Sequence, residues 1–468
     1  MKINNYIVGM CFVLLTGCSG FLDEVDKDKL IPSTTEHYSA VLLKEFAGQQ
    51  AYFGGSDFMS DNVGEYAYMS EESRKNWKPI YTWQLEIELD ENGERVNNNT
   101  VWQGMYEDVA VANYVLELID EAAGSQEERD FIKGEAYFVR GWSYLMLANL
   151  YGAPYRPVTA QTDLGVILRT DNEIEQTYQR ASLAETYRQI TGDLLEAKRL
   201  IAASGVVKSK LHPSVSACDL LLSRTYLYMQ DWEKAEASAS EVIKTGSLSR
   251  MTSGTPYATE ARGDVLYSCL VQMGASESSL YEKGWRVNNE LIDLYAAGDL
   301  RVEAFFEKIP GKMGRVYYPR KRTKAFSELG YDFLRVSEAY LNRAEARYHN
   351  GGDAGGDLRA LLETRYSDKA SVTIAAGDAL LEQILTERRK ELCFEGHHRW
   401  FDLRRISDRP TVTHDFTLTD ADGNTLGTQR YTLFPDDLNY TLPIPLKERD
   451  NNPLIRNNER YEKLPENV

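Results

Sequence analysis

The stretch from Leu380 to Arg405 places charged side chains inside what the pattern predicts to be the longest buried helix of the chain. Its apolar residues recur near the 3.6-residue helical period, so one face belongs to the core. Charged residues lie between them: Glu387, Arg388, Arg389, Glu391 and Glu395. A buried charge is stable only when an opposite charge and hydrogen bonds compensate it. We therefore expect a structural ion network here, with Gly396 ending the helix in a left-handed conformation.

Helical spacing suggests how this network pairs. Arg388 and Glu391 are three residues apart, Glu391 and Glu395 are four apart, and all three share a helix face. One arginine cannot balance two carboxylates, so a later charged residue has to fold back toward the second one. The candidates are Arg399, Asp402 and Arg404.

Two chemical alternatives exist for the same stretch. Glu391 and Glu395 could be the acid and base of a glycosidase, but such carboxylates flank the sugar and do not share one helix turn. His397 and His398 could bind a metal, but adjacent histidines point apart and no acidic partner stands at ligand spacing. No other compact motif places two carboxylates across a cleft. We predict no catalytic residue, no metal site and no cofactor, and hence a protein that is not an enzyme.

Three ordered motifs resemble a known family. The run ERRKELCFEGHHRWFDLRR, Glu387 to Arg405, is similar to the C-terminal signature of the SusD/RagB family of Bacteroidetes surface lipoproteins. FIKGEAYFVRGWSYLMLANLYGAPY, Phe131 to Tyr155, resembles an early helix of that family with its Tyr-Gly-x-Pro exit. LPIPLKERDNNPLIRN, Leu442 to Asn457, resembles its closing segment. With the N-terminal signal described below, the likeness spans nearly the whole chain.

The N-terminus predicts a lipoprotein. Lys2 is followed by the apolar run from Tyr6 to Leu15, which is too short to span a bilayer and has the form of a signal-peptide core. Leu15-Thr16-Gly17-Cys18 is similar to a bacterial lipobox, in which Cys18 becomes the lipidated N-terminus after cleavage. A secretory signal that merely contains a cysteine is the alternative. We expect residues 1–17 to be a signal peptide, residues 18–32 a lipidated tether, and residues 33–468 a single SusD-like domain.

Composition narrows the range of partners. The formal net charge is −18, from 71 acidic and 53 basic residues, and no basic cluster offsets it. Such a chain repels phosphates, which excludes nucleic acid as a partner. The 29 tyrosines and 7 tryptophans fall in good part outside the helical patterns. That distribution suits a binding surface.

Helical periodicity predicts a mainly α fold built from tetratricopeptide-like helix pairs in a right-handed superhelical scaffold. The pattern covers residues of about 100–246 and 333–405, with a first short helix from Thr34 to Gly48. The individual helices are expected at 102–116, 127–150, 182–203, 213–229 and 231–245. Within the second group, a helix–turn–helix layout spans residues 333–366, and the Leu380–Arg405 helix closes the last pair.

Two long irregular insertions interrupt this scaffold, at residues 53–99 and 247–332. Long loops in a compact protein commonly carry function, and aromatic rings on them can stack on the C–H faces of sugars. We predict these segments to form the ligand side. The candidate ligand residues are Trp77, Tyr81, Trp83 and Trp285 for stacking, with Asp61 and Arg74 for hydrogen bonds. Core filling is the alternative for each ring.

The C-terminal segment from Thr411 to Leu446 alternates apolar and polar residues around an Asp-Gly turn, which predicts a β-hairpin. A calcium loop at Asp420–Asn424 is the alternative, but the twelve-residue pattern and its closing glutamate are missing. Cys218, Cys269 and Cys393 are odd in number and irregularly spaced, so buried thiols are expected rather than disulfides.

The resemblance implies a cell-surface, outer-membrane lipoprotein that captures glycans and passes them to a SusC-like TonB-dependent transporter without catalysing a reaction. Its helical repeats would then face that transporter. The matching motifs belong to the scaffold, so they transfer no ligand residues. Three other functions stay open: a peptide-binding RagB-like lipoprotein, a tetratricopeptide adaptor that binds only protein, and a glycoside hydrolase.

Overall fold

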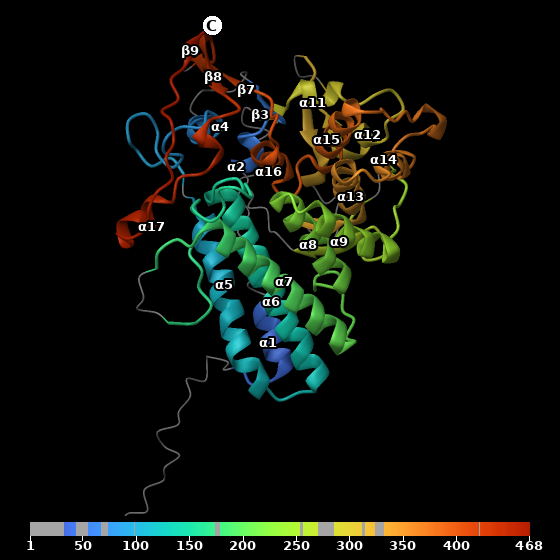
Figure 1. Cartoon of the computed structure of the whole chain (residues 1–468). Coiled ribbons are helices and arrows are strands. Elements are labelled where there is room, and N and C mark those ends of the chain that lie inside the picture. Colours follow the sequence, from blue (N-terminus) through green and yellow to red (C-terminus); the bar gives the residue numbers. More distant parts are fainter. Residues whose placement is uncertain are drawn as a thin grey trace, which may run out of the picture.

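The computed structural model of this chain has two regions (Figure 1): a bundle of long helices, and a mixed region of short helices and strands that carries the C-terminus. Most regular structure is helical and the strands form small sheets, which confirms the mainly α fold class. The structure describes residues 32–43, 55–66, 74–97, 99–173, 178–252, 256–269, 285–310, 314–322, 332–420 and 422–468. Cys18, the lipobox and most of the tether lie outside these residues.

The bundle consists of helices that pack in sequence order. They are α1 (Thr35–Leu42), α5 (Val101–Leu118), α6 (Gln126–Tyr151), α7 (Leu183–Ser204), α8 (Val215–Met229) and α9 (Trp232–Thr245). From α5 onward each helix lies within about two residues of its predicted range, and side-chain caps fix the N-termini of α6, α7, α8 and α9. Ser125 with Glu128, and Ser182 with Glu185, form capping boxes at α6 and α7. The end of the predicted first helix, residues 44–48, lies outside the described part of the chain.

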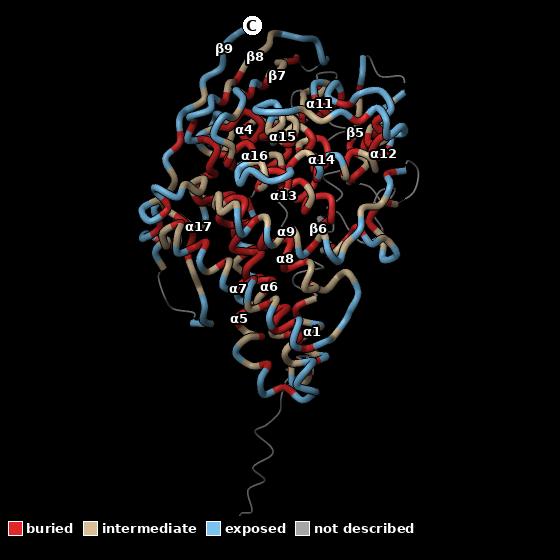
Figure 2. Tube along the Cα trace, turned by 45° about the vertical axis from the view of Figure 1, so that its right-hand side comes forward, coloured by how far each residue is buried: buried red, intermediate tan, exposed pale blue. Residues whose placement is uncertain are grey.

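Helix α6 is the centre of the bundle and the longest helix of the described chain, so the prediction that Leu380–Arg405 would be the longest is wrong. Nearly every residue of α6 from Phe131 onward is buried. Its glycines let α7 approach closely: a Cβ at Gly134 would lie 2.8 Å from the Ile201 side chain, and one at Gly141 would lie 3.1 Å from Leu194. Figure 2 shows buried residues running through the middle of both regions.

The second helical group contains α13 (Val336–Asn350), α14 (Ala354–Leu362), α15 (Asp378–Leu392) and α16 (His398–Arg405). Helix α13 packs against α8 and α9, which joins this group to the bundle. The stretch Leu380–Arg405 thus forms parts of two helices, and the first of them ends at Leu392, before the predicted end at Gly396. Its chain turns at Phe394, Gly396 and His397, all with positive φ, so Gly396 takes the predicted left-handed conformation but lies beyond the end of α15.

Where the structure describes the irregular insertions, their elements are short. The first holds α2 (Gly55–Phe58), β1 (Val63–Glu65) and α4 (Lys78–Tyr81). The second holds β2 (Val265–Cys269), β3 (Trp285–Val287), α11 (Asn289–Asp293), α12 (Arg301–Phe305), β4 (Phe306–Lys308) and β5 (Tyr317–Pro319), and β6 (Asp332–Arg335) begins at its last residue. Antiparallel pairs form between β2 and β6 and between β4 and β5, while β1 pairs with β3 and so links the two insertions.

The predicted C-terminal hairpin is confirmed. Strands β7 (Val412–Thr419) and β8 (Thr425–Leu433) pair in antiparallel register, and β9 (Glu466–Asn467) adds to β8. Asp420 holds the turn by accepting hydrogen bonds from the backbone N–H groups of Asp422 and Asn424, and Gly423 has a φ of +83°. Between the hairpin and β9 lies α17 (Leu446–Asn451). No helix in the described ranges is long and apolar enough to cross a membrane.

Candidate functional site

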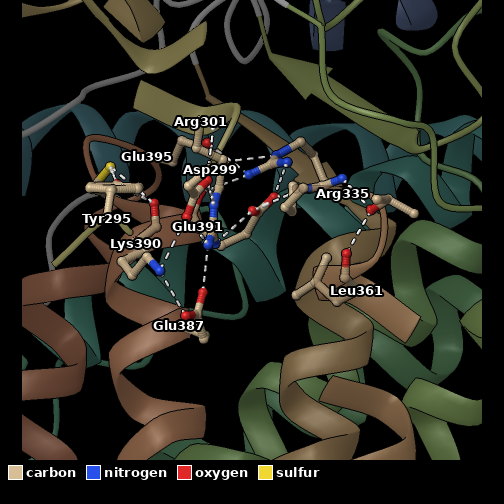
Figure 3. Close-up of polar contacts among 12 residues, drawn as sticks. Tyr295, Asp299, Arg301, Arg335, Leu361, Glu387, Lys390, Glu391 and Glu395 are labelled. Carbon is tan, nitrogen blue, oxygen red and sulfur yellow. Dashed lines mark hydrogen bonds and ion pairs between the residues drawn. The ribbon is translucent and has the colours of Figure 1, made fainter. Parts of the chain in front are cut away.

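The charged residues of α15 form a buried ion network (Figure 3). The Glu391 carboxylate accepts hydrogen bonds from Arg335 Nη1 at 2.8 Å and from Arg365 Nε and Nη2 at 2.9 and 2.8 Å. Arg301 Nη1 lies 3.5 Å from the same carboxylate. All four side chains are fully buried. Three guanidinium groups therefore surround one carboxylate, which confirms the predicted structural network.

The neighbouring carboxylates are compensated in the same way. Glu395 accepts hydrogen bonds from Arg335 Nε and Nη2 at 3.0 and 2.8 Å and also pairs with Lys321. Glu387 accepts from Arg301 Nη2 at 2.6 Å and from Lys390 Nζ at 2.7 Å. Glu387, Glu391 and Glu395 thus bind cations from α12, β6, η4 (Arg320–Arg322) and α15 itself, together with Arg365 from the chain after α14.

This network does not suit acid–base chemistry. Burial alone would raise the pKa of Glu391, but Arg365 and Arg335 outweigh it and hold the pKa well below its usual range. A glycosidase needs one carboxyl group with a raised pKa and a second across the bound sugar. Glu391 and Glu395 instead share Arg335 on one side of a turn, so the structure does not support them as an acid–base pair.

The predicted pairing inside the stretch is wrong in its details. Arg388 pairs with Asp402, not with Glu391, and its Nη1 donates to Asn342 at 2.6 Å. Arg399 pairs with Asp61, and Arg404 donates to backbone carbonyls, including that of Tyr440 at 2.7 Å. The later charged residues do fold back, but Asp402 reaches Arg388, and Arg399 and Arg404 reach distant segments. None of them compensates Glu395. Each charged side chain ties α15 or α16 to another part of the fold.

The two histidines are structural. His398 is buried between guanidinium groups, with Nδ1 3.3 Å from Arg388 Nη2 and Nε2 3.3 Å from Arg224 Nη2. Burial and these two cations lower its pKa well below the usual value. The His397 ring stacks on Phe401, with 5.4 Å between the ring centroids. In the parts of the chain that the structure describes, no group of three His, Cys, Asp or Glu side chains could hold a metal.

Three of the four predicted stacking rings lie in the core, and two of them, Tyr81 and Trp83, hold the His414 ring between them. The exposed fraction is 2% for Tyr81 and 0% for Trp83 and Trp285. The His414 ring lies between Tyr81 and Trp83, with ring centroids 4.1 and 4.3 Å away, and Trp285 meets Tyr81 edge-on at 4.5 Å. Rings buried in this way leave little surface for a sugar, although Tyr81 also lines a cavity that is described below. The core-filling alternative describes these three.

His414 also makes stability depend on pH. Its Nδ1 lies 2.7 Å from the carbonyl oxygen of Tyr81, and Nε2 lies 3.1 Å from that of Ser60. These carbonyls favour the charged ring, but burial outweighs them and lowers the pKa of His414 to about 4. The neutral form therefore persists in the folded protein below the pKa of about 6.5 expected for the unfolded chain.

As pH falls through about 6.5, the unfolded chain takes up a proton at this histidine before the folded chain does. The contribution of neutral His414 to the free energy of unfolding is therefore fully present above about pH 6.5 and is lost progressively as the pH falls below it. We expect His414 to lower the free energy of unfolding by about 2 kcal/mol between about pH 7.5 and pH 5. His414→Gln should remove this share of the loss in urea unfolding at both pH values, whereas the same change at partly exposed His37 should not. An unchanged pH dependence in His414→Gln would refute the assignment.

The predicted polar ligand residues are also paired. Asp61 binds Arg399 Nε and Nη2 at 2.7 and 2.6 Å, and Arg389 Nη1 lies 3.1 Å away. Burial would raise the pKa of Asp61, but the two arginines lower it. Arg74 is buried, pairs with Glu65 and donates to the Thr417 carbonyl at 2.7 Å.

Trp77 alone of the four predicted rings is partly exposed, and it stacks on Phe58 with 4.9 Å between the ring centroids.

A cavity lies where the two irregular insertions meet the hairpin. Strand β1 comes from the first insertion, β3 from the second, and β7 from the hairpin; β1 contacts both of the others. The cavity between them has a volume of about 720 Å³. We call it the block cavity; residues in its wall include Glu65, Tyr66, Arg286, Asn288, Asp415 and Thr417. The sequence thus predicted which segments come together, but of the six side chains it proposed as ligand residues only Tyr81 lies in this wall.

Arg286 is the wall residue best placed to hydrogen-bond a ligand. Its Nε is buried and has no acceptor among the described residues. By contrast, Glu65 accepts from the Thr417 N–H at 2.9 Å, and Asp415 pairs with Arg430 at 2.8 Å. The alternation of Trp285-Arg286-Val287 contained the missing signal, because neighbours in a strand point to opposite faces. A buried Trp285 places Arg286 on the other face.

Two family models match consecutive parts of the chain. The model described as "Starch-binding associating with outer membrane" matches residues 20–227, and the model of the SusD family matches residues 249–461. The chain belongs to the SusD/RagB family. The contacts above give the family-like motif of Glu387–Arg405 its physical role, because its charged residues join the helical groups to the irregular insertions.

Curated relatives agree with this assignment. The SusD-like protein P2 of Formosa agariphila is 23% identical, over 87% of this chain and 92% of that protein. The starch-binding protein SusD of Bacteroides thetaiotaomicron is 31% identical over 27% of this chain and 21% of that protein.

Solved structures share the SusD-like fold. A SusD superfamily protein from Bacteroides thetaiotaomicron has a TM-score of 0.72 at 23% identity, covering 91% of this chain and 100% of that one. A putative sugar binding protein from Bacteroides vulgatus has a TM-score of 0.70 at 21% identity, covering 92% and 99%.

Proposed function

We propose that this SusD/RagB family protein binds oligosaccharides at the outer membrane and carries out no catalysis itself. The observation that carries the proposal is the match of residues 20–227 to a model described as starch-binding and associated with the outer membrane. The relatives named for starch and sugar binding point the same way. Glu391 and Glu395 both pair with Arg335, so the two carboxylates that most resembled a glycosidase pair do not support that activity.

We place the ligand site in the block cavity. Its volume of about 720 Å³ lies within the range of about 300–1,000 Å³ that is usual for small-ligand sites. Its wall offers the hydroxyl groups of Thr413, Thr417, Thr425 and Thr428. Arg286 supplies a donor. Of the rings predicted from the sequence, Tyr81 lies in this wall and is 2% exposed, while Trp77 is partly exposed but does not line the cavity. Threonine hydroxyls and a guanidinium suit the hydroxyl groups of a sugar.

Loss of the polar wall tests this placement. We expect Arg286→Ala combined with Asn288→Ala to weaken binding at least about tenfold, because a hydrogen bond to a charged group contributes about 1.5–3 kcal/mol. The full-length protein, purified in detergent, is titrated with maltohexaose, cellohexaose, xylohexaose and mannohexaose. Arg315→Ala is the control, since it removes an exposed arginine paired with Asp293. Equal affinities of the double variant and wild type would reject the block cavity as the site.

We further propose that Cys18 carries the lipid anchor and that the bound glycan passes to a SusC-like TonB-dependent transporter. Leu15-Thr16-Gly17-Cys18 supports the anchor, and the family resemblance supports the transporter. Cys18→Ser should move the protein from the membrane fraction to the soluble fraction, because lipid chains bind membranes with about 0.8 kcal/mol per buried methylene. Wild type purified from membranes should bring the transporter with it. A Cys18→Ser protein that stays in the membrane would refute the anchor.

A further inference from the structure

A second cavity lies where α5 and α17 meet Ile167, Arg169 and Tyr178. Figure 1 shows α17 beside the end of α5 that lies nearest the mixed region. We call this space the α5–α17 cavity. Its volume is about 800 Å³, again in the range of small-ligand sites, and it shares no lining residue with the block cavity. It is therefore a separate place for a ligand.

Aromatic side chains form one part of its wall, and contacts hold them in place. Trp102 and Tyr106 come from α5, with ring centroids 4.9 Å apart, and the Tyr106 hydroxyl donates to the Ile167 carbonyl at 2.9 Å. Tyr178 stands beside them in the wall, and the Arg169 guanidinium lies 5.0 Å from its ring centroid. Tyr106 and Tyr178 are only partly buried. Fixed rings that remain accessible can receive the C–H face of a sugar with little loss of conformational entropy.

Asn99 supplies an unused donor at the same wall. Its side chain is 8% exposed, and its Oδ1 accepts a hydrogen bond from the Tyr151 hydroxyl at 2.8 Å. Its Nδ2 is buried and has no acceptor in the described part of the chain. A buried donor without a partner costs about 1–3 kcal/mol. An acceptor that enters the cavity would remove that cost.

The charges of the wall indicate a neutral ligand. Three basic side chains are balanced by three acidic ones: Arg95, Arg169 and Lys447 against Glu88, Glu107 and Glu448. The side-chain amides of Gln103, Asn451 and Asn452 add both donors and acceptors. A strongly anionic ligand would meet the carboxylates, and an apolar one would leave this polar wall desolvated. The hydroxyl groups of a neutral sugar both donate and accept hydrogen bonds, so they can pair with the basic, the acidic and the amide side chains of this wall.

We propose that the α5–α17 cavity is a second saccharide site, which holds a short neutral segment of an oligosaccharide against Tyr106 and Tyr178 while Asn99 donates to one of its oxygens. This inference rests on the proposed carbohydrate-binding function but not on the block cavity. Two sites without shared residues would let one chain hold two ligand molecules, or two segments of one polymer.

Titration calorimetry on the full-length protein in detergent tests the proposal with the same four hexasaccharides. Tyr178→Ala removes a partly exposed ring. Asn99→Asp keeps an oxygen for the Tyr151 hydroxyl and removes the unpaired N–H groups. Each change should weaken binding at the α5–α17 cavity at least tenfold. Arg286→Ala with Asn288→Ala is the matched pair of changes in the block cavity, and circular dichroism checks that every variant is folded.

Two molecules bound per wild-type chain, with one retained in Tyr178→Ala and in Asn99→Asp, would support the second site. One molecule per chain, bound equally well by both variants and lost in the block-cavity variant, would overturn the second site and leave the proposed function standing. Absence of binding to all four sugars would overturn both.

Discussion

Replacement of Glu391 by glutamine is expected to lower the free energy of unfolding by about 3–5 kcal/mol, because it leaves buried guanidinium groups without their counter-charge. The substitution keeps the size of the side chain, so lost packing contributes little. Arg335 would still have Glu395, at 2.8 Å. Arg365 would lose its carboxylate partner. It would keep hydrogen bonds to the Ser249 carbonyl, the Thr364 hydroxyl and the Tyr257 hydroxyl, the last at 3.3 Å. A fully buried arginine without a counter-charge is more stable in water, so the substitution shifts the equilibrium toward the unfolded chain.

Urea unfolding of wild type and Glu391→Gln at neutral pH measures the effect. Glu196→Gln is the matched control, since it removes the same charge from a surface pair: Arg199 Nη2 lies 2.6 Å from Glu196, and both side chains are well exposed. Exposed pairs contribute about 0–1 kcal/mol, so this variant should unfold near wild type. Similar losses in the two variants would mean that the network does not depend on its buried charges.

The network also shows where sequence reasoning succeeds. The presence of charged residues on an apolar helix face predicted buried pairing, because no other arrangement tolerates them. Helices α6 and α7 followed from apolar periodicity, and the capping boxes found at their N-termini also act within a few residues. The Asp-Gly turn of the hairpin is equally local.

Ion-pair partners that lie far apart in the sequence could not be predicted from such local signals. Arg335 lies 56 residues from Glu391 along the chain, and Arg399 lies 338 residues from Asp61. Spacing on one helix favoured Arg388 as the partner of Glu391, but tertiary packing turns Arg388 toward Asp402. Ion pairing is decided by which segments meet, and a helix pattern holds no information about that.

The sequence predicted the segments that form the candidate site, but of its proposed ligand residues only Tyr81 lines the block cavity. Aromatic rings in irregular segments suggested a binding surface, yet such segments also wrap the core and contribute large rings to it. Tyr81 and Trp83 turn inward because they stack on His414, a residue of the hairpin more than 300 positions away. Residue types and local spacing are the same whether a ring faces solvent or core. The alternation along β3 was the one local signal that separated Trp285 from Arg286.

Trp285→Ala should show most clearly whether Trp285 fills the core or contacts a ligand. Trp285 is fully buried, lies 4.5 Å from Tyr81 and 5.3 Å from Phe58 between ring centroids, and belongs to the strand that pairs with β1. Its removal leaves a cavity where β1 and β3 join the two insertions. We expect a loss of about 3–5 kcal/mol in the free energy of unfolding, as for other large buried aromatic residues.

Trp77→Ala is the matched control, because Trp77 is partly exposed and stacks on one neighbour, Phe58. It should cost clearly less stability, and if Trp77 contacts the glycan it should weaken binding in a protein that remains folded. Thermal unfolding followed by circular dichroism ranks the two variants, and glycan titration well below their melting temperatures separates binding from folding. A Trp285→Ala protein that is as stable as wild type but no longer binds glycan would return Trp285 to the ligand site. That result would require β3 to move, since in the present arrangement the ring has no exposed face.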